Sequence, residues 1–253
     1  MRKALSLIIP VIVIIPFFIL TIFYMVIPGF LLRLVGARRT AEKLYRRCGT
    51  GIARWILFGL NVKVEVSGRE NMPPQGTPMC IIANHQSLMD VVAIVAHCGV
   101  TPGFIAKKEL MYIPVIASYM RALQCVMLDR KSPKSAIASI SQGVDKIKQG
   151  VPIVVFPEGT RSRNGQLGSF KAGSLKLATR AKALIVPIVL SGGRKGFEER
   201  KSSRRTVMQM HICEPIPTHE MQKNEEHTFT DQVYERLAGD YEALLQRKEL
   251  GRS

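Results

Sequence analysis

The seven residues from Asn84 to Asp90 place an imidazole near a carboxylate. His85 and Asp90 stand between two apolar runs, Met79 to Ala83 and Val91 to Ala96, which predict a buried strand and a helix. Backbone amides point outward at such a strand-to-helix turn, and the turn is accessible to a ligand. An imidazole beside a carboxylate can remove a proton from a hydroxyl group. This stretch is therefore the first candidate for a catalytic site.

The position at which the helix begins decides whether the two side chains can meet. Within one continuous α-helix, a separation of five residues turns them about 140° apart, onto different faces. Ser87 and Asp90 have the spacing of a capping box at a helix N-terminus, which leaves His85 in the preceding turn, able to fold back. The alternative interpretation is that Asp90 only completes the cap and that His85 is an ordinary turn residue.

Three further blocks of sequence follow this motif in order. The heptad reads N-H-x-S-x-x-D, and the other blocks are K-K-E-L-M-Y-I-P to M-L-D-R (107–130), F-P-E-G-T-R-S (156–162) and I-V-P-I (185–188). In this order they resemble the motifs of the glycerolipid acyltransferases, the group that includes the 1-acylglycerol-3-phosphate acyltransferases. The resemblance covers about residues 60 to 215.

The resemblance implies a reaction and its substrates. A fatty acyl group would move from acyl-CoA or acyl-carrier protein, acting as co-substrate, to the sn-2 hydroxyl of lysophosphatidic acid, forming phosphatidic acid. His85 would be the base and Asp90 the group that orients it, with no covalent acyl-enzyme, no cofactor and no metal ion. Two alternatives stay open: another lysophospholipid or lyso-aminolipid acceptor, or a non-catalytic basic protein that binds membrane surfaces.

The third block supplies the predicted binding residues. Arg161 can hold the acceptor phosphate with two parallel hydrogen bonds, and Glu158 can bind the acceptor hydroxyl or position Arg161. The alternative is a structural ion pair between these two residues. Oxyanion donors are expected from amides of the heptad turn or of residues 158–160. The predicted site comprises His85 and Asp90 as catalytic residues, Lys107, Arg130, Glu158, Gly159, Thr160 and Arg161 as substrate-binding residues, and Asn84 and Ser87 as supporting residues.

From residue 61 onward, apolar strand-like runs alternate with helical patterns, one of them from Ser169 to Arg180. This alternation predicts an α/β domain over residues 61–253, with a mixed, largely parallel sheet flanked by helices, and the resemblance makes it glycerol-3-phosphate acyltransferase-like. Each polar block follows a predicted strand. Because ligands bind beyond the carboxyl ends of strands in such sheets, we expect the blocks to converge in one cleft.

Residues 1–60 are expected to form an N-terminal helical segment that anchors the protein to a membrane. Ala4 to Leu32 carries no charge over about 29 residues, whereas roughly 20 suffice to cross a bilayer. Pro10, Pro16 and Pro28 interrupt the run. Either one kinked span or a bent segment that enters and leaves by the cytosolic leaflet fits, and basic residues on both flanks favour the second. We expect the inner (cytoplasmic) membrane, with the catalytic domain on its cytosolic side.

The net charge of +17 favours anionic partners. Nucleic acid is disfavoured, since no zinc-ligand spacing or aromatic RNA-binding signature is present. The expected partners are the lysophospholipid and acyl thioester substrates, membrane lipid and acyl-carrier protein. The basic stretch 192–205 is either a solvated surface or a contact for anionic headgroups or the phosphates of coenzyme A. The five cysteines show no recurring pair, which indicates reduced thiols.

Overall fold

A computed structural model describes residues 21–129, 133–171, 173–200, 204–218 and 226–250. Its seven strands form one sheet in the order β1-β7-β6-β2-β5-β3-β4. Strand β7 runs antiparallel to β6, and every other neighbouring pair is parallel. The prediction of a mixed, largely parallel sheet is confirmed. The strands are β1 (Val62–Ser67), β2 (Met79–Ala83), β3 (Gly103–Lys107), β4 (Val126–Leu128), β5 (Ile153–Val155), β6 (Leu184–Ser191) and β7 (Thr206–Ile212).

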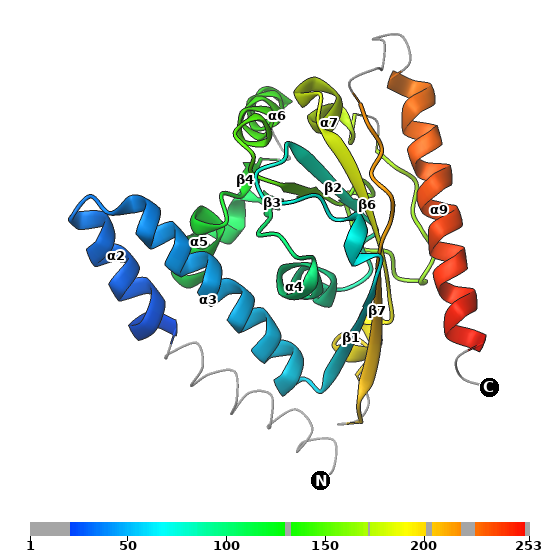
Figure 1. The fold of residues 1–253 in the computed structure, drawn as a ribbon, viewed down its shortest axis with the longest axis horizontal. Helices are drawn as coiled ribbons and strands as arrows, with labels where there is room; N and C mark the ends of the chain where they lie inside the picture. Colours follow the sequence, from blue (N-terminus) through cyan, green and yellow to red (C-terminus); the bar gives the residue numbers. More distant parts are fainter. Residues whose placement is uncertain (1–20, 130–132, 172, 201–203, 219–225, 251–253) are drawn as a thin grey trace.

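Helices cover both faces of this sheet (Figure 1). Helices α3 and α4 lie on one face, and α6, α7 and α9 lie on the other. The helices are α2 (Ile27–Leu34), α3 (Arg38–Gly59), α4 (Leu88–His97), α5 (Pro114–Ala122), α6 (Pro133–Lys148), α7 (Lys176–Ala181), α8 (Gly193–Gly196) and α9 (Glu226–Leu250), with short helices η1 (Ile22–Val26), η2 (Arg69–Asn71) and η3 (Lys108–Tyr112).

Strand β2 lies in the middle of the sheet and is buried along its whole length. Successive side chains of a strand point to opposite faces. Met79, Ile81 and Ala83 therefore pack in the core beneath α3 and α4, whereas Cys80 and Ile82 pack beneath α6 and α7. This burial on both faces explains why the strand reads as a continuous apolar run in the sequence.

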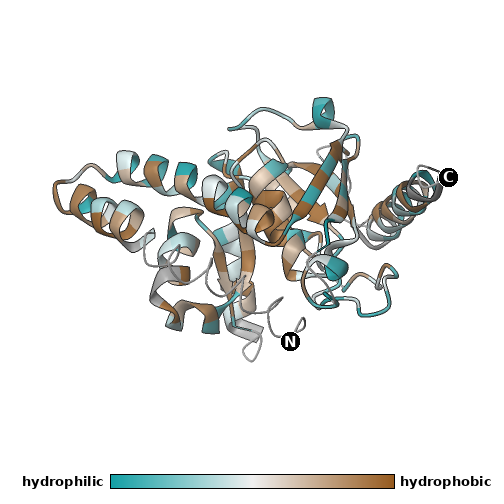
Figure 2. Ribbon diagram, turned by 90° about the horizontal axis from the view of Figure 1, so that it is seen from below, coloured by the Kyte–Doolittle hydropathy of each residue, from teal (hydrophilic) through white to brown (hydrophobic). Residues whose placement is uncertain are grey.

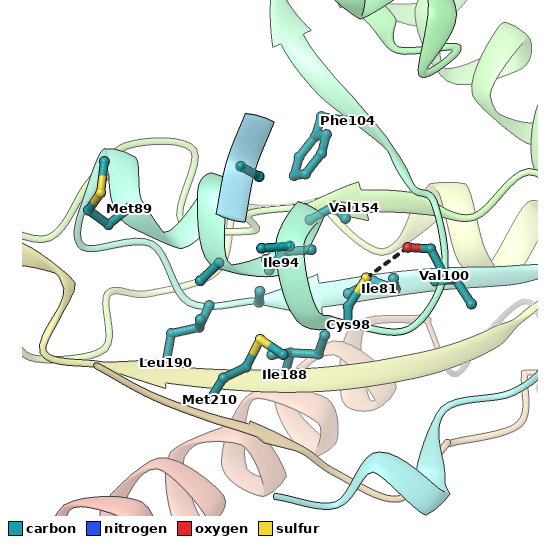
Figure 3. Close-up of a cluster of buried hydrophobic side chains, with 14 of the residues drawn as sticks. Ile81, Met89, Ile94, Cys98, Val100, Phe104, Val154, Ile188, Leu190 and Met210 are labelled. Carbon is teal, nitrogen blue, oxygen red and sulfur yellow. Dashed lines mark hydrogen bonds between the residues drawn. The ribbon is translucent and has the colours of Figure 1, made fainter. Parts of the chain in front are cut away.

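Helix α4 is fixed on the sheet by its apolar face. Ile94 and Met89 pack with Ile81 of β2 and Ile188 of β6 in one buried cluster (Figure 3). Ile94 is fully buried, and truncating such a side chain to alanine costs about 2–5 kcal/mol of folding free energy. Because α4 begins directly after the candidate heptad, this packing also fixes the turn that carries His85.

Helices α2 and α3 form a hairpin beside the domain (Figure 1). Gly29 packs directly on the Tyr45 ring, where a Cβ would overlap the ring. Hydrophobic residues recur along this hairpin (Figure 2), and Phe23, Phe30 and Leu34 are exposed. Among the residues that the structure describes, no helix has the length and apolar character needed to cross a bilayer. The first 20 residues of the predicted membrane segment lie outside the described part of the chain.

The helix predicted from Ser169 to Arg180 is wrong in its first half. Helix α7 covers only Lys176–Ala181. The backbone before α7 makes hydrogen bonds to the third sequence block instead of helical ones. Gly168 N–H donates to the Glu158 carboxylate, and Lys171 N–H donates to the Pro157 carbonyl. This segment therefore folds against the third sequence block as a loop.

Candidate active site

The start of α4 decides the geometry of the heptad. Ser87 is the N-cap residue, with extended backbone angles, and its Oγ accepts a hydrogen bond from Met89 N at 3.0 Å. The Asp90 carboxylate accepts from Ser87 N at 2.7 Å, which completes the capping box. The helix thus begins at Leu88, and His85 lies in the preceding turn, as the spacing predicts.

Asp90 does more than cap the helix. Its Oδ2 lies 3.1 Å from His85 Nδ1 and also accepts from Gln86 N at 2.6 Å. The same carboxylate oxygen thus serves both the helix cap and the imidazole. Asp90 is 1% exposed, so its position is fixed by surrounding protein. The contact through Nδ1 directs the other ring nitrogen, Nε2, away from Asp90.

Phe156 supports the imidazole from one side. Its ring stacks on that of His85, with centroids 4.0 Å apart and planes inclined by 18°. Phe156 directly follows β5, which pairs with β2 in parallel register. The sequence analysis assigned no role to this residue. Its position directly before the Pro-Glu-Gly-Thr-Arg block was the available signal, since the carboxyl ends of adjacent parallel strands meet at one edge of a sheet.

Glu158 is built into the same turn. Its Oε1 accepts from His85 N at 2.8 Å and its Oε2 accepts from Gly168 N at 3.0 Å. Ser162 N donates in turn to the His85 carbonyl at 2.8 Å. Glu158 is 5% exposed, and burial raises its pKa, although the two backbone hydrogen bonds oppose the shift. The first and third blocks are therefore joined through main-chain contacts.

Gly159 and Gly168 make this close approach possible. Gly159 adopts a φ of +69°, a left-handed conformation that favours glycine, and a Cβ there would lie 2.7 Å from Cε of Lys171. At Gly168 a Cβ would lie 2.6 Å from Oε2 of Glu158. A side chain at either position would push the loop away from the turn that carries His85.

Arg161 forms an ion pair with Glu198. Its Nη1 donates to Oε1 of Glu198 at 3.0 Å, while Glu158 is held by backbone amides. The alternative of an ion pair between Arg161 and Glu158 is thus not what the structure shows, because the Glu158 carboxylate points into the protein and Arg161 points outward, with 44% of its side chain exposed. Glu198 also accepts from Ser87 Oγ at 2.6 Å and from Leu88 N at 2.9 Å.

Glu198 is a site residue that the sequence analysis missed. It lies in the basic stretch after β6, 111 residues from Ser87, and belongs to none of the four blocks. The only available signal was an acidic residue within a strongly basic segment. Burial by itself raises the pKa of Glu198, but the hydrogen bonds from Ser87 and Leu88, together with the Arg161 charge, lower it below its usual value.

Asn84 anchors the beginning of the turn. It is fully buried, and its side chain exchanges two hydrogen bonds with the backbone of Leu190, at 2.9 Å to the carbonyl and 2.8 Å from the amide. These bonds tie the end of β2 to the neighbouring strand β6. Asn84 is therefore placed to support the turn rather than to contact a substrate.

The remaining predicted residues lie farther out. Lys107 ends β3, two strands from β2 in the order β2-β5-β3, so about 10 Å separate the two strands. Thr160 is exposed and borders an open hollow of about 420 Å³ that Glu158 and Ser162 also line. Arg130 lies outside the described residues. The structure thus brings His85, Asp90, Glu158 and Arg161 around one turn and places Lys107 at its periphery.

The backbone amides of the heptad are occupied. Those of Gln86 and Ser87 donate to Asp90, and those of Leu88 and Met89 donate to Glu198 and to Ser87 Oγ. Gly159 N donates to the Phe156 carbonyl. Of the two predicted sources of oxyanion donors, the amides of the heptad turn therefore already have hydrogen-bond partners within the protein in this conformation.

An imidazole oriented by a carboxylate can take a proton from a hydroxyl group, and the carboxyl edge of a parallel α/β sheet is where ligands bind in such folds. The sequence profile of the family described as Acyltransferase matches residues 63–191. The protein therefore belongs to the acyltransferase family, and the family resemblance seen in the sequence is confirmed.

Relatives of this chain carry more specific names. The chain is 32% identical over 223 residues to the 1-acyl-sn-glycerol-3-phosphate acyltransferase of Saccharomyces cerevisiae, covering 85% of this chain and 71% of that one. The chloroplastic enzyme of the same name from Arabidopsis thaliana is 36% identical over 51% of this chain. The chain spans little more than a third of the length of the chloroplastic relatives that it matches, 36% and 38%.

A solved structure agrees with these relatives in fold. The crystal structure of the 1-acyl-sn-glycerophosphate (LPA) acyltransferase PlsC from Thermotoga maritima superposes with a TM-score of 0.76 at 30% sequence identity. The match covers 96% of this chain and 98% of that one. The arrangement of sheet and helices is therefore shared almost from end to end.

Proposed function

We propose that the protein transfers a fatty acyl group from an acyl thioester to the sn-2 hydroxyl of lysophosphatidic acid, giving phosphatidic acid. The observation that carries this proposal is the 3.1 Å contact between His85 Nδ1 and a buried Asp90 carboxylate, at a turn that also holds Arg161 through Glu198. The relatives named above are acyltransferases for this acceptor, which supports the same substrate here.

In the proposed mechanism His85 acts as a base through Nε2. It takes the proton of the sn-2 hydroxyl while that oxygen attacks the thioester carbonyl carbon, and Asp90 stabilises the imidazolium that forms. The tetrahedral intermediate then collapses, the carbon–sulfur bond breaks, and the imidazolium returns its proton to the departing sulfur. No acyl-enzyme forms, and neither a cofactor nor a metal ion takes part. Acyl-CoA and acyl-carrier protein are both suitable donors.

The oxyanion of the intermediate requires a donor in place. Because the heptad amides are occupied, we assign this role to the backbone N–H of Thr160, in the left-handed turn that Gly159 makes. Arg161 holds the acceptor phosphate, and Lys107 and Arg130 are further candidates for binding the same phosphate.

Residues 1–60 serve in this proposal as the membrane anchor of an acyltransferase domain at 61–253. Support comes from the exposed apolar side chains of Phe23, Phe30 and Leu34, which stand close in sequence to Arg33 and Arg38. Apolar side chains flanked by cations suit an interface between acyl chains and anionic headgroups. Such an anchor places the domain beside its lipid substrates, on the cytosolic side of the cytoplasmic membrane.

The test is His85→Ala in the full chain. Labelled acyl-CoA is incubated with lysophosphatidic acid, other lysophospholipids and a lyso-aminolipid, and product is measured for both proteins. We expect the wild type to acylate lysophosphatidic acid preferentially and the variant to lose about 10²–10⁴-fold in rate. Thermal unfolding checks that the variant folds. Near-normal transfer by the variant would refute the mechanism, and preference for another lysolipid would refute the acceptor.

A further inference from the structure

The Glu198 carboxylate occupies a cluster of donors suited to an oxyanion. Three groups converge on it: the Ser87 hydroxyl at 2.6 Å, the Leu88 backbone N–H at 2.9 Å and the Arg161 guanidinium at 3.0 Å. Two of the three belong to the N-terminus of α4, whose helix dipole favours negative charge, and the third is a full positive charge. A hydroxyl, an amide and an arginine are also the donors that proteins use for phosphate groups.

Glu198 reaches this cluster from outside the core. It lies in the turn after α8, and 20% of its side chain is exposed. The backbone of this turn is held independently of the carboxylate, because Glu199 N donates to the Arg194 carbonyl and Arg200 donates to the Leu60 carbonyl. Rotation about the side-chain bonds of Glu198 therefore frees the three donors without unfolding the turn.

We propose that Glu198 is an internal competitor for the acceptor phosphate, occupying its place in the unliganded enzyme and leaving when lysophosphatidic acid binds. The inference rests on the proposed function, since it places the acceptor phosphate on Arg161. A ligand that must displace an occupant binds with an apparent affinity lowered by the fraction of protein in which the site is open.

Glu198 should compete only with ligands that place a phosphate group on the three donors. Lysophosphatidic acid must displace Glu198, whereas a monoacylglycerol, with the same acyl chain and glycerol but no phosphate, has no group to place there. Removing the carboxylate charge should therefore tighten the binding of the first ligand and leave the second unchanged. A role for Glu198 in positioning Arg161 predicts the reverse for lysophosphatidic acid.

The experiment measures binding without turnover. Glu198→Gln is made in the full-length His85→Ala protein, and lysophosphatidic acid and monoacylglycerol are titrated in mixed micelles by calorimetry without an acyl donor. We expect lysophosphatidic acid to bind about 5- to 10-fold more tightly to the double variant than to His85→Ala, with monoacylglycerol unchanged. Because no acyl transfer is involved, failure of the proposed reaction and failure of this inference give separate results.

Glu199→Gln is the matched control. It removes the same charge from the adjacent residue, whose carboxylate pairs with Arg194 at 2.7 Å instead of with Arg161. We expect this control to leave both affinities unchanged within about 2-fold. If Glu198→Gln and Glu199→Gln raised the affinity for lysophosphatidic acid equally, the cause would be the change in net charge, and the inference would be overturned. Weaker or unchanged binding of lysophosphatidic acid to the Glu198 variant would overturn it as well. Thermal unfolding checks that both variants are folded.

Discussion

The turn that carries His85 and the cationic rim beside it, formed by Arg161 and Lys107, are built differently. In the turn, Asn84 and Ser87 are fully buried, Asp90 is 1% exposed, and each makes hydrogen bonds within the protein. On the rim, Arg161 has 44% of its side chain exposed, and Lys107 is exposed at the end of β3. Asp90, which is assigned to proton transfer, is thus positioned before substrate arrives. The cations assigned to the phosphate are partly exposed to solvent, and their attraction to the phosphate strengthens when the ligand excludes water.

The largest effect should follow from a substitution in the buried turn, at Asp90. Asp90→Asn keeps the shape of the side chain but removes the charge that stabilises the imidazolium. It also weakens three contacts of Oδ2, those with the His85 ring, Gln86 N and Ser87 N, because an amide oxygen is a weaker acceptor than a carboxylate oxygen. We expect kcat to fall about 10²–10⁴-fold, with little change in KM for lysophosphatidic acid. Asp145→Asn, at an exposed position of α6, is the control in steady-state assays.

Changing the rim should alter binding more than chemistry. Arg161→Ala removes the charge assigned to the acceptor phosphate, and a hydrogen bond to a charged group contributes about 1.5–3 kcal/mol. We expect KM for lysophosphatidic acid to rise about 10- to 100-fold and kcat to change less. Arg180→Ala, at an exposed position of α7, should leave both constants unchanged. A loss confined to kcat would mean that Arg161 acts in the chemical step, and the contrast between the turn and the rim would then be wrong.

A smaller effect is expected at Phe156. Phe156→Leu keeps an apolar side chain under the imidazole but loses the ring stacking, which contributes about 0.5–1.5 kcal/mol in aromatic pairs. We expect kcat to fall about 2- to 10-fold, with KM for the acceptor unchanged. Single-turnover rates with acyl-CoA measure this directly. An unchanged rate would show that Asp90 alone fixes the ring.

The smallest effect concerns the dependence of stability on pH. Burial raises the pKa of Glu158 above its ordinary value of 4.5, so in this range the folded protein binds more protons at this site than the unfolded chain. The stability that Glu158 contributes is complete below pH 4.5 and is lost as the pH rises through the raised pKa. The free energy of unfolding of the wild type and of Glu158→Gln is measured with denaturant in mild detergent at a series of pH values. The difference, wild type minus variant, should decline as the pH rises from 4.5 through the raised pKa. A constant difference would contradict the shift.

The sequence by itself determined the local features of this protein. The spacing of Ser87 and Asp90 fixes where α4 begins, and a capping box depends only on residues within one turn. The central strands were predictable for a similar reason, since β2 and β6 are buried on both faces and must be apolar throughout. Together these two features place His85 in the turn before α4, within reach of Asp90.

The tertiary structure decided which distant groups join that turn. Pairing of β2 with β5 brings Phe156 and Glu158 to His85, and the path of the chain after β6 brings Glu198 to Arg161. Neither strand order nor the position of a loop 111 residues from Ser87 is encoded in local spacing, because both depend on how the whole sheet packs. The same order, which separates β3 from β2 by β5, leaves Lys107 on the rim.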